Sequence, residues 1–125
     1  MNPRILLYTP DTAKQEAISK LCSRLSFEIC LLGPEDFHTN VGYLAGLPIQ
    51  AASASPIPPL STLPELMVLC GISQNDLDTF LDIYNQSGIS PIPLKAMLTT
   101  HNIGWSLYEL ACHLQAEHQK MFAGN

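Results

Sequence analysis

Three side chains in this sequence have chemistry suited to a small active site: Lys95, His101 and Asp11. Apolar residues flank Lys95, and a lysine amine that is shielded from water can act as a nucleophile or a base. His101 is near enough along the chain to assist it, and Asp11 supplies a carboxylate from the other half. An enzyme built on this set requires the three side chains to converge on one substrate position.

The stretch around Lys95 also has a structural explanation. Pro91 and Pro93 have no N–H group to donate to a neighbouring strand, which is typical of a strand at the edge of a sheet. Lysine on an edge strand commonly prevents unwanted pairing with other chains. The sequence therefore leaves two hypotheses for Lys95, a catalytic amine and a structural edge residue.

Small polar residues follow three of the predicted strands. They are Thr9 and Asp11 after the first strand, Gly71, Ser73 and Gln74 after the third, and Thr99, Thr100, His101 and Asn102 after the fourth. Open parallel sheets bind ligands outside the carboxyl ends of their strands, so these residues form the predicted ligand site. Helices that begin after Thr9 and Gly71 would direct free N–H groups at it, which makes a small anion a candidate ligand. The same residue types also cap helices and form turns, and no glycine motif for nucleotide phosphates is present.

Apolar runs and helical spacing predict the elements that would position these residues. Strands are expected over residues 4–9, 27–33, 65–72 and 91–98, and helices over 10–25, 74–87 and from 106 onward, with a short or broken helix over 34–47. Thr9, Ser73 and Ser106 are the predicted caps of the three long helices.

The first and third strands are apolar at consecutive positions, "ILLY" and "LMVLC". A strand covered by helices on both faces shows this pattern, whereas a strand with one wet face alternates. We therefore expect an α/β fold, a small three-layer sandwich with a four-stranded, mostly parallel sheet in the order 2-1-3-4. The alternative is a ferredoxin-like α+β fold with an extra C-terminal helix, whose helices cover one face of the sheet.

A weak internal repeat is visible when the sequence is shifted by 62 positions. The shift places Ile5 over Met67, Ile18 over Phe80 and Leu21 over Ile83. These pairs share hydrophobic character rather than identity. They predict two strand–helix–strand units of common architecture without establishing a duplication.

Composition limits the classes of function. The 125 residues fit a single domain, within which residues 48–64 form a loop or arm rich in Pro, Ala and Ser. Six basic and eleven acidic residues, scattered without a basic stripe, exclude a nucleic-acid-binding role. No signal peptide or membrane-spanning run is visible, so we expect a cytoplasmic protein with four reduced cysteines. The histidines are dispersed, and neither a metal nor another cofactor is expected.

Three stretches resemble a known family: "GPEDF…GYLAGL" within residues 33–47, "MVLCGISQNDLDTFL", and "PIPLKAMLTTHNIGWSLYELACHLQAEHQKM". Together they are similar to the small bacterial proteins of domain-of-unknown-function family 3783. That family has no assigned activity, so the resemblance implies membership and transfers no role to any residue.

Our leading hypothesis is a non-enzymatic module that binds a ligand or a protein. Only 14% of its residues are charged, which suits a surface that forms a homodimer or meets another protein partner. One alternative is a small enzyme that uses the strand-end crevice with Lys95 and His101. The other is a scaffold that docks a partner through the arm at residues 48–64.

Overall fold

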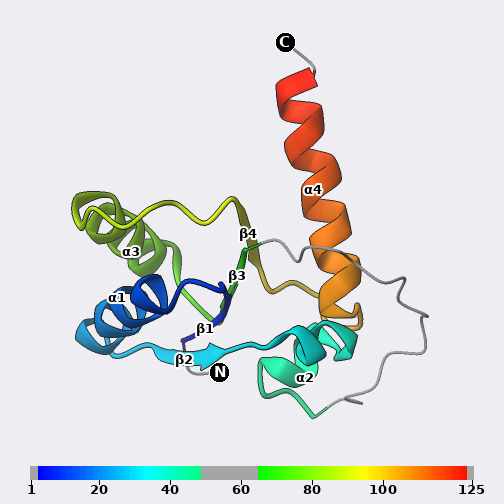
Figure 1. Cartoon of the computed structure of the whole chain (residues 1–125). Helices are drawn as coiled ribbons and strands as arrows, with labels where there is room; N and C mark the ends of the chain where they lie inside the picture. Colours follow the sequence, from blue (N-terminus) through cyan, green and yellow to red (C-terminus); the bar gives the residue numbers. More distant parts are fainter. Residues whose placement is uncertain (1–2, 49–64, 124–125) are drawn as a thin grey trace.

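The computed structural model describes residues 3–48 and 65–123, with side chains up to residue 117. The elements run in the order β1 (Arg4–Tyr8), α1 (Thr12–Arg24), β2 (Glu28–Leu31), the 3-10 helix η1 (Pro34–His38), α2 (Val41–Leu44), β3 (Leu66–Cys70), α3 (Gln74–Gln86), β4 (Leu94–Met97) and α4 (Leu107–Ala123) (Figure 1). Apart from Pro48, the arm predicted at residues 48–64 lies outside the described residues. Among the described helices, none has both the length and the apolar character of a membrane span.

Four strands form one sheet in the order β2-β1-β3-β4, which confirms the predicted strand order. β1 and β2 pair in parallel, and so do β3 and β4. The two central strands, β1 and β3, are antiparallel, with Leu6 opposite Val68. The sheet is therefore mixed, and the expected parallel arrangement holds for its two outer pairings but not for its centre.

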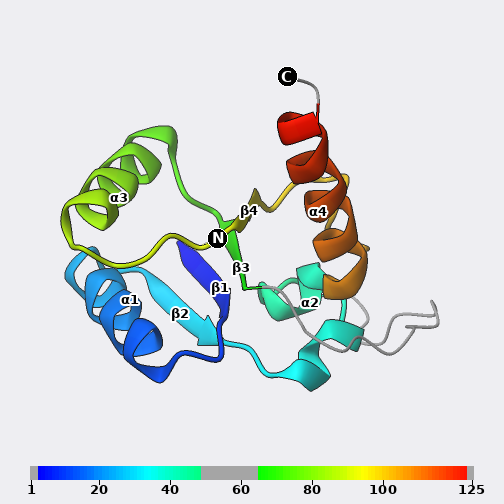
Figure 2. The same ribbon diagram turned by 45° about the horizontal axis from the view of Figure 1, so that its top comes forward.

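Helices cover both faces of the sheet, as the consecutive apolar residues predicted. α1 and α3 lie on one face, and α2 and α4 lie on the other (Figure 1, Figure 2). Within β1, Ile5 and Leu7 face α1 and α3, whereas Leu6 between them faces α2 and α4. The three-layer prediction is confirmed, and the alternative with helices on one face is wrong.

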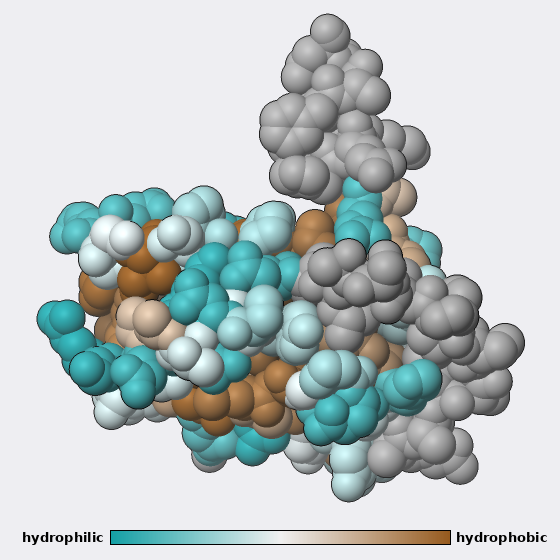
Figure 3. Space-filling view, viewed as in Figure 1, coloured by the Kyte–Doolittle hydropathy of each residue, from teal (hydrophilic) through white to brown (hydrophobic). Residues whose placement is uncertain are grey.

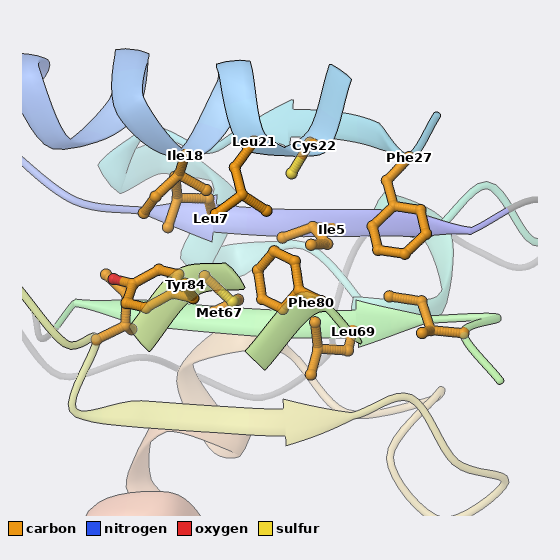
Figure 4. Packing of buried hydrophobic residues seen from close by; sticks show 12 residues of the cluster. Ile5, Leu7, Ile18, Leu21, Cys22, Phe27, Met67, Leu69, Phe80 and Tyr84 are labelled. Carbon is orange, nitrogen blue, oxygen red and sulfur yellow. The ribbon is translucent and has the colours of Figure 1, made fainter. Parts of the chain in front are cut away.

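The core beneath α1 and α3 is closed by aromatic side chains. Figure 4 shows Phe80 and Tyr84 of α3 lying over the side chains of β1 and β3, with Phe27 beside them. The ring centroids of Phe27 and Phe80 are 6.1 Å apart, and those of Phe80 and Tyr84 are 6.0 Å apart. No described residue of β4 belongs to this core, and β4 runs along its side in Figure 4. The α3 face of β4 is therefore left at the margin of the core.

The two halves of the chain share one architecture, as the repeat predicted. The bounds of β1 and β3 are 62 positions apart, and so are the bounds of α1 and α3. Leu6 and Val68, which face each other at the centre of the sheet, are separated by the same offset. A local twofold axis therefore passes between these two residues and relates a first unit, residues 4–47, to a second unit, residues 65–123.

From the second strand of each unit onward, the offset between the two units is 66 positions. This offset relates β2 to β4 and the start of α2 to the start of α4. The two helix starts bond to each other reciprocally. The Val41 N–H donates to the Trp105 carbonyl at 2.8 Å, and the Leu107 N–H donates to the Thr39 carbonyl at 3.0 Å. The twofold relation therefore extends through the layer that contains α2 and α4.

Side-chain caps begin the long helices. Ser73 and Ser106 each accept a hydrogen bond from a backbone N–H of the first turn, at 3.2 and 3.1 Å, as predicted. The predicted cap Thr9 is wrong, because Asp11 accepts from the Lys14 N–H at 3.2 Å and α1 begins after it. Thr9 is buried at the end of β1 instead.

Candidate functional site

The antiparallel centre of the sheet divides the predicted ligand site into two parts. Because Tyr8 pairs with Leu66, β1 ends where β3 begins. Thr9 and Asp11 therefore lie at one end of the sheet, and the residues after β3 lie at the other, about 15 Å away for strands of this length. The predicted convergence of these residues is wrong, and the starts of α1 and α3 cannot share one anion.

The residues that follow β3 and β4 do share one end of the sheet, because these two strands are parallel. They are the exposed Gly71, Ser73, Gln74, Thr99, Thr100 and His101, and the buried Asn102. Ser73 caps α3, and the Gln74 Nε2 donates to the Asp78 Oδ1 at 3.0 Å. Internal contacts account for these two side chains, and a ligand at this end stays a prediction.

Asn102 holds the turn that follows β4. Its Oδ1 accepts from the Thr99 N–H at 2.9 Å, and its Nδ2 donates to the Met97 carbonyl at 2.9 Å. The equivalent turn after β2 is closed by Asp36, whose carboxylate accepts from the Gly33 N–H at 2.7 Å. Because both units use this turn, the structural role of closing it is enough to explain the presence of Asn102.

The three candidate catalytic residues do not meet. Asp11 lies at the end of the sheet opposite His101, because β1 and β3 are antiparallel. Lys95 pairs with Met67, so its side chain lies on the face of the sheet that carries α1 and α3, while His101 is exposed in the turn after β4. The convergence that the enzyme hypothesis requires is not met. β4 is an edge strand, as its prolines predicted.

An ion pair that sequence reasoning missed lies at the β1 end of the sheet. The Lys14 side chain is 7% exposed, and its Nζ donates to the two carboxylate oxygens of Glu65 at 3.0 and 3.1 Å and to the Pro91 carbonyl at 3.1 Å. The Thr9 hydroxyl also donates to Glu65. These bonds tie α1 to the segments that precede β3 and β4. The signal in the sequence is a lysine one turn before Ile18, on the apolar stripe of α1.

A shallow pocket of about 320 Å³ adjoins this ion pair and includes Lys14 and Ser90 in its lining. The Lys14 ammonium has three donors, and the three bonds just described engage them. Next to it, the Tyr84 hydroxyl donates to the Ser90 carbonyl at 2.5 Å. Burial, with the charge of Glu65 as the smaller cause, raises the pKa of Tyr84 to about 12. These groups are held in internal bonds, and we interpret them as structural.

An apolar groove lies between α3 and β4. Its volume is about 380 Å³, and it is lined by Leu69, Leu77, Leu81, Asn85, Lys95, Ala96 and Met97. Met97 is 37% exposed, unusual for a large apolar residue in this protein. A smaller cavity of about 30 Å³ shares Leu81, Asn85 and Lys95 with the groove and extends it toward Phe80. The α3–β4 groove is therefore a hydrophobic depression beside a sheet edge.

The first unit has an equivalent groove of about 330 Å³, lined by Gln15, Glu16, Ser19, Lys20 and Leu31. The offset between the units places Gln15 and Ser19 at the positions of Leu77 and Leu81. Figure 3 shows hydrophobic surface along β2, where Leu31 is 49% exposed at the position equivalent to Met97. The fold thus accepts polar side chains on the helix side of this groove.

Fold and groove together define an α/β protein of two related units, the second of which carries an apolar groove. Residues 65–121 match the model of DUF3783, a domain of unknown function. The match runs from the residue before β3 into α4, so the second unit of the chain is similar to this family. The resemblance is confirmed there, while the similar stretch at residues 33–47 lies outside the match. Neither a curated protein nor a solved structure is significantly similar to the chain.

Proposed function

We propose that this protein is a non-enzymatic module that binds a segment of a partner protein in the α3–β4 groove. One observation carries the proposal. Leu77 and Leu81 line the groove of the second unit, whereas the same positions in the first unit hold Gln15 and Ser19. The fold does not require leucine there, and a partly exposed apolar surface beside a sheet edge is typical of a binding site.

The separation of the candidate catalytic groups supports a role without catalysis. Asp11 and His101 lie at opposite ends of the sheet, and the buried Lys14 is held by three acceptors. A cytoplasmic location is part of the proposal. The four cysteines are free thiols, in keeping with a reducing compartment.

A different protein is a better occupant of the groove than a second copy of this chain. Each copy carries a formal charge of −5, so two copies repel each other. Lys95 also stands on the exposed edge strand, where lysine opposes strand pairing between copies. We therefore expect a monomer that binds a partner.

Selection from a displayed library of random peptides tests the proposal. Wild-type protein is the bait, and the Leu77→Gln/Leu81→Ser variant, which copies the first unit, is the counter-bait. We expect peptides that bind the wild type and lose at least about tenfold in affinity for the variant, equal to about 1.4 kcal/mol. Peptides that bind both proteins equally would contradict the proposal.

Two controls keep this test interpretable. Because Leu77 and Leu81 also pack against the core, Met97→Gln changes the groove from the strand side, and circular dichroism checks that both variants fold. Light scattering measures the mass in solution. A dimer that Met97→Gln dissociates would identify a second copy as the occupant and overturn the choice of a different protein.

A further inference from the structure

Resting on the proposed function, we infer that the segment bound in the α3–β4 groove is cationic as well as apolar. α3 carries Asp76, Asp78 and Asp82 and has neither lysine nor arginine. Asp78 lies three residues before Leu81 on α3, and the equivalent Glu16 lines the groove of the first unit, which places Asp78 at the rim of the α3–β4 groove. Its Oδ1 also accepts a hydrogen bond from the exposed Gln74 Nε2 at 3.0 Å. A cation on the partner would therefore meet a carboxylate at the rim while its apolar neighbour enters the groove.

The first unit again provides the comparison. On α1, the positions equivalent to Asp78 and Asp82 hold Glu16 and Lys20, so an acidic and a basic side chain stand together there. On α3 both positions are acidic. The second unit differs from the first in both properties, since its groove is apolar and its helix rim carries only negative charge. One partner with apolar and basic residues accounts for both differences.

Lys95 restricts where the cation of the partner lies. It lines the groove from β4, on the side opposite α3. A second cation next to Lys95 would be repelled, whereas one over α3 would be attracted. The bound segment therefore presents its basic side chain toward Asp78 and Asp82.

Three short labelled peptides test this inference by fluorescence anisotropy with the 125-residue chain. They alternate leucine with lysine, leucine with glutamate, or serine with lysine. We expect the leucine–lysine peptide to bind about tenfold more tightly than either of the others, and to weaken as salt is added. Asp78→Asn should weaken it about two- to fivefold, as expected for loss of an exposed charge pair. Glu16→Gln, the matched change on α1, should leave the affinity unchanged.

The outcomes separate this inference from the proposed function. If the two leucine peptides bind equally well and both fail to bind Leu77→Gln/Leu81→Ser, the groove binds apolar segments and the cationic preference is overturned. If the serine–lysine peptide binds as tightly as the leucine–lysine peptide, charge alone drives binding and the combined preference is overturned. If the leucine–lysine peptide does not bind, or binds the double variant unchanged, the proposed function fails as well.

Discussion

Lys14→Met should destabilise the protein more than any single substitution on its surface. The variant leaves the Glu65 carboxylate without its cation and removes the donor to the Pro91 carbonyl. Breaking a buried pair costs about 3–5 kcal/mol, and breaking an exposed pair costs at most about 1 kcal/mol. The two side chains are 7% and 26% exposed, so an intermediate loss of about 2–3 kcal/mol is expected.

A double-mutant cycle separates the ion pair from lost packing. Glu65→Met should also destabilise, because it leaves the Lys14 ammonium in a buried position. Lys14→Met/Glu65→Met removes both charges. Its loss in free energy of unfolding should be about 1–3 kcal/mol smaller than the sum of the losses in the two single variants. Urea unfolding, followed by the fluorescence of the single Trp105, supplies the free energies of unfolding.

Glu28→Gln is the matched control, because it breaks the ion pair that Glu28 forms with Arg4. The side chains of Glu28 and Arg4 are 46% and 30% exposed. Its expected cost is less than about 1 kcal/mol. The reasoning is refuted if Lys14→Met costs no more than Glu28→Gln. It is also refuted if the loss in free energy of unfolding of the double variant equals the sum of the losses caused by Lys14→Met and Glu65→Met.

Two further predictions concern buried polar groups. Burial raises the pKa of the Cys22 thiol to about 11 and that of Cys70 to about 12, from 9.0. Well below pH 9.0 these thiols are protonated in both states, but between pH 9.0 and the folded-state pKa of each thiol only the unfolded chain ionises, so the free energy of unfolding falls by up to about 1.4 kcal/mol per pH unit for each. Urea midpoints above pH 9.0 should show this slope, and Cys70→Ala should reduce it; an unchanged slope would contradict the assignment. Asn102→Ala should cost about 1–3 kcal/mol because it leaves two backbone groups unbonded, whereas the exposed Thr100→Ala should cost less than about 0.5 kcal/mol. Equal urea midpoints for these two variants would show that the turn after β4 does not depend on Asn102.

Hydrophobic pattern predicted the layers of this fold but not the direction of its third strand. Consecutive apolar residues in "ILLY" and "LMVLC" require cover on both faces, and the structure supplies it. Strand direction depends on where the chain re-enters the sheet. The many residues between α2 and β3 allow entry from either end. The internal repeat is compatible with either direction, and the structure shows the twofold axis between Leu6 and Val68 that makes the central strands antiparallel.

The same error in strand direction explains why the predicted site did not assemble. Thr9 and Asp11 were assigned to the end that Gly71 and Asn102 occupy, on the assumption of parallel central strands. The α3–β4 groove was missed for another reason. Leu77 and Leu81 belong to an ordinary apolar helix stripe, and only comparison with the first unit separates them from core residues.

Chemical-shift mapping tests the central claim most directly. A peptide selected on the wild-type protein is added to the isotope-labelled 125-residue chain, and the shifted backbone amides are identified. We predict the largest changes at Leu77, Leu81 and residues 95–97, with none at the equivalent groove of Gln15 and Ser19. Changes confined to the first unit, or to the turn at residues 99–102, would contradict the assignment of the α3–β4 groove as the binding site.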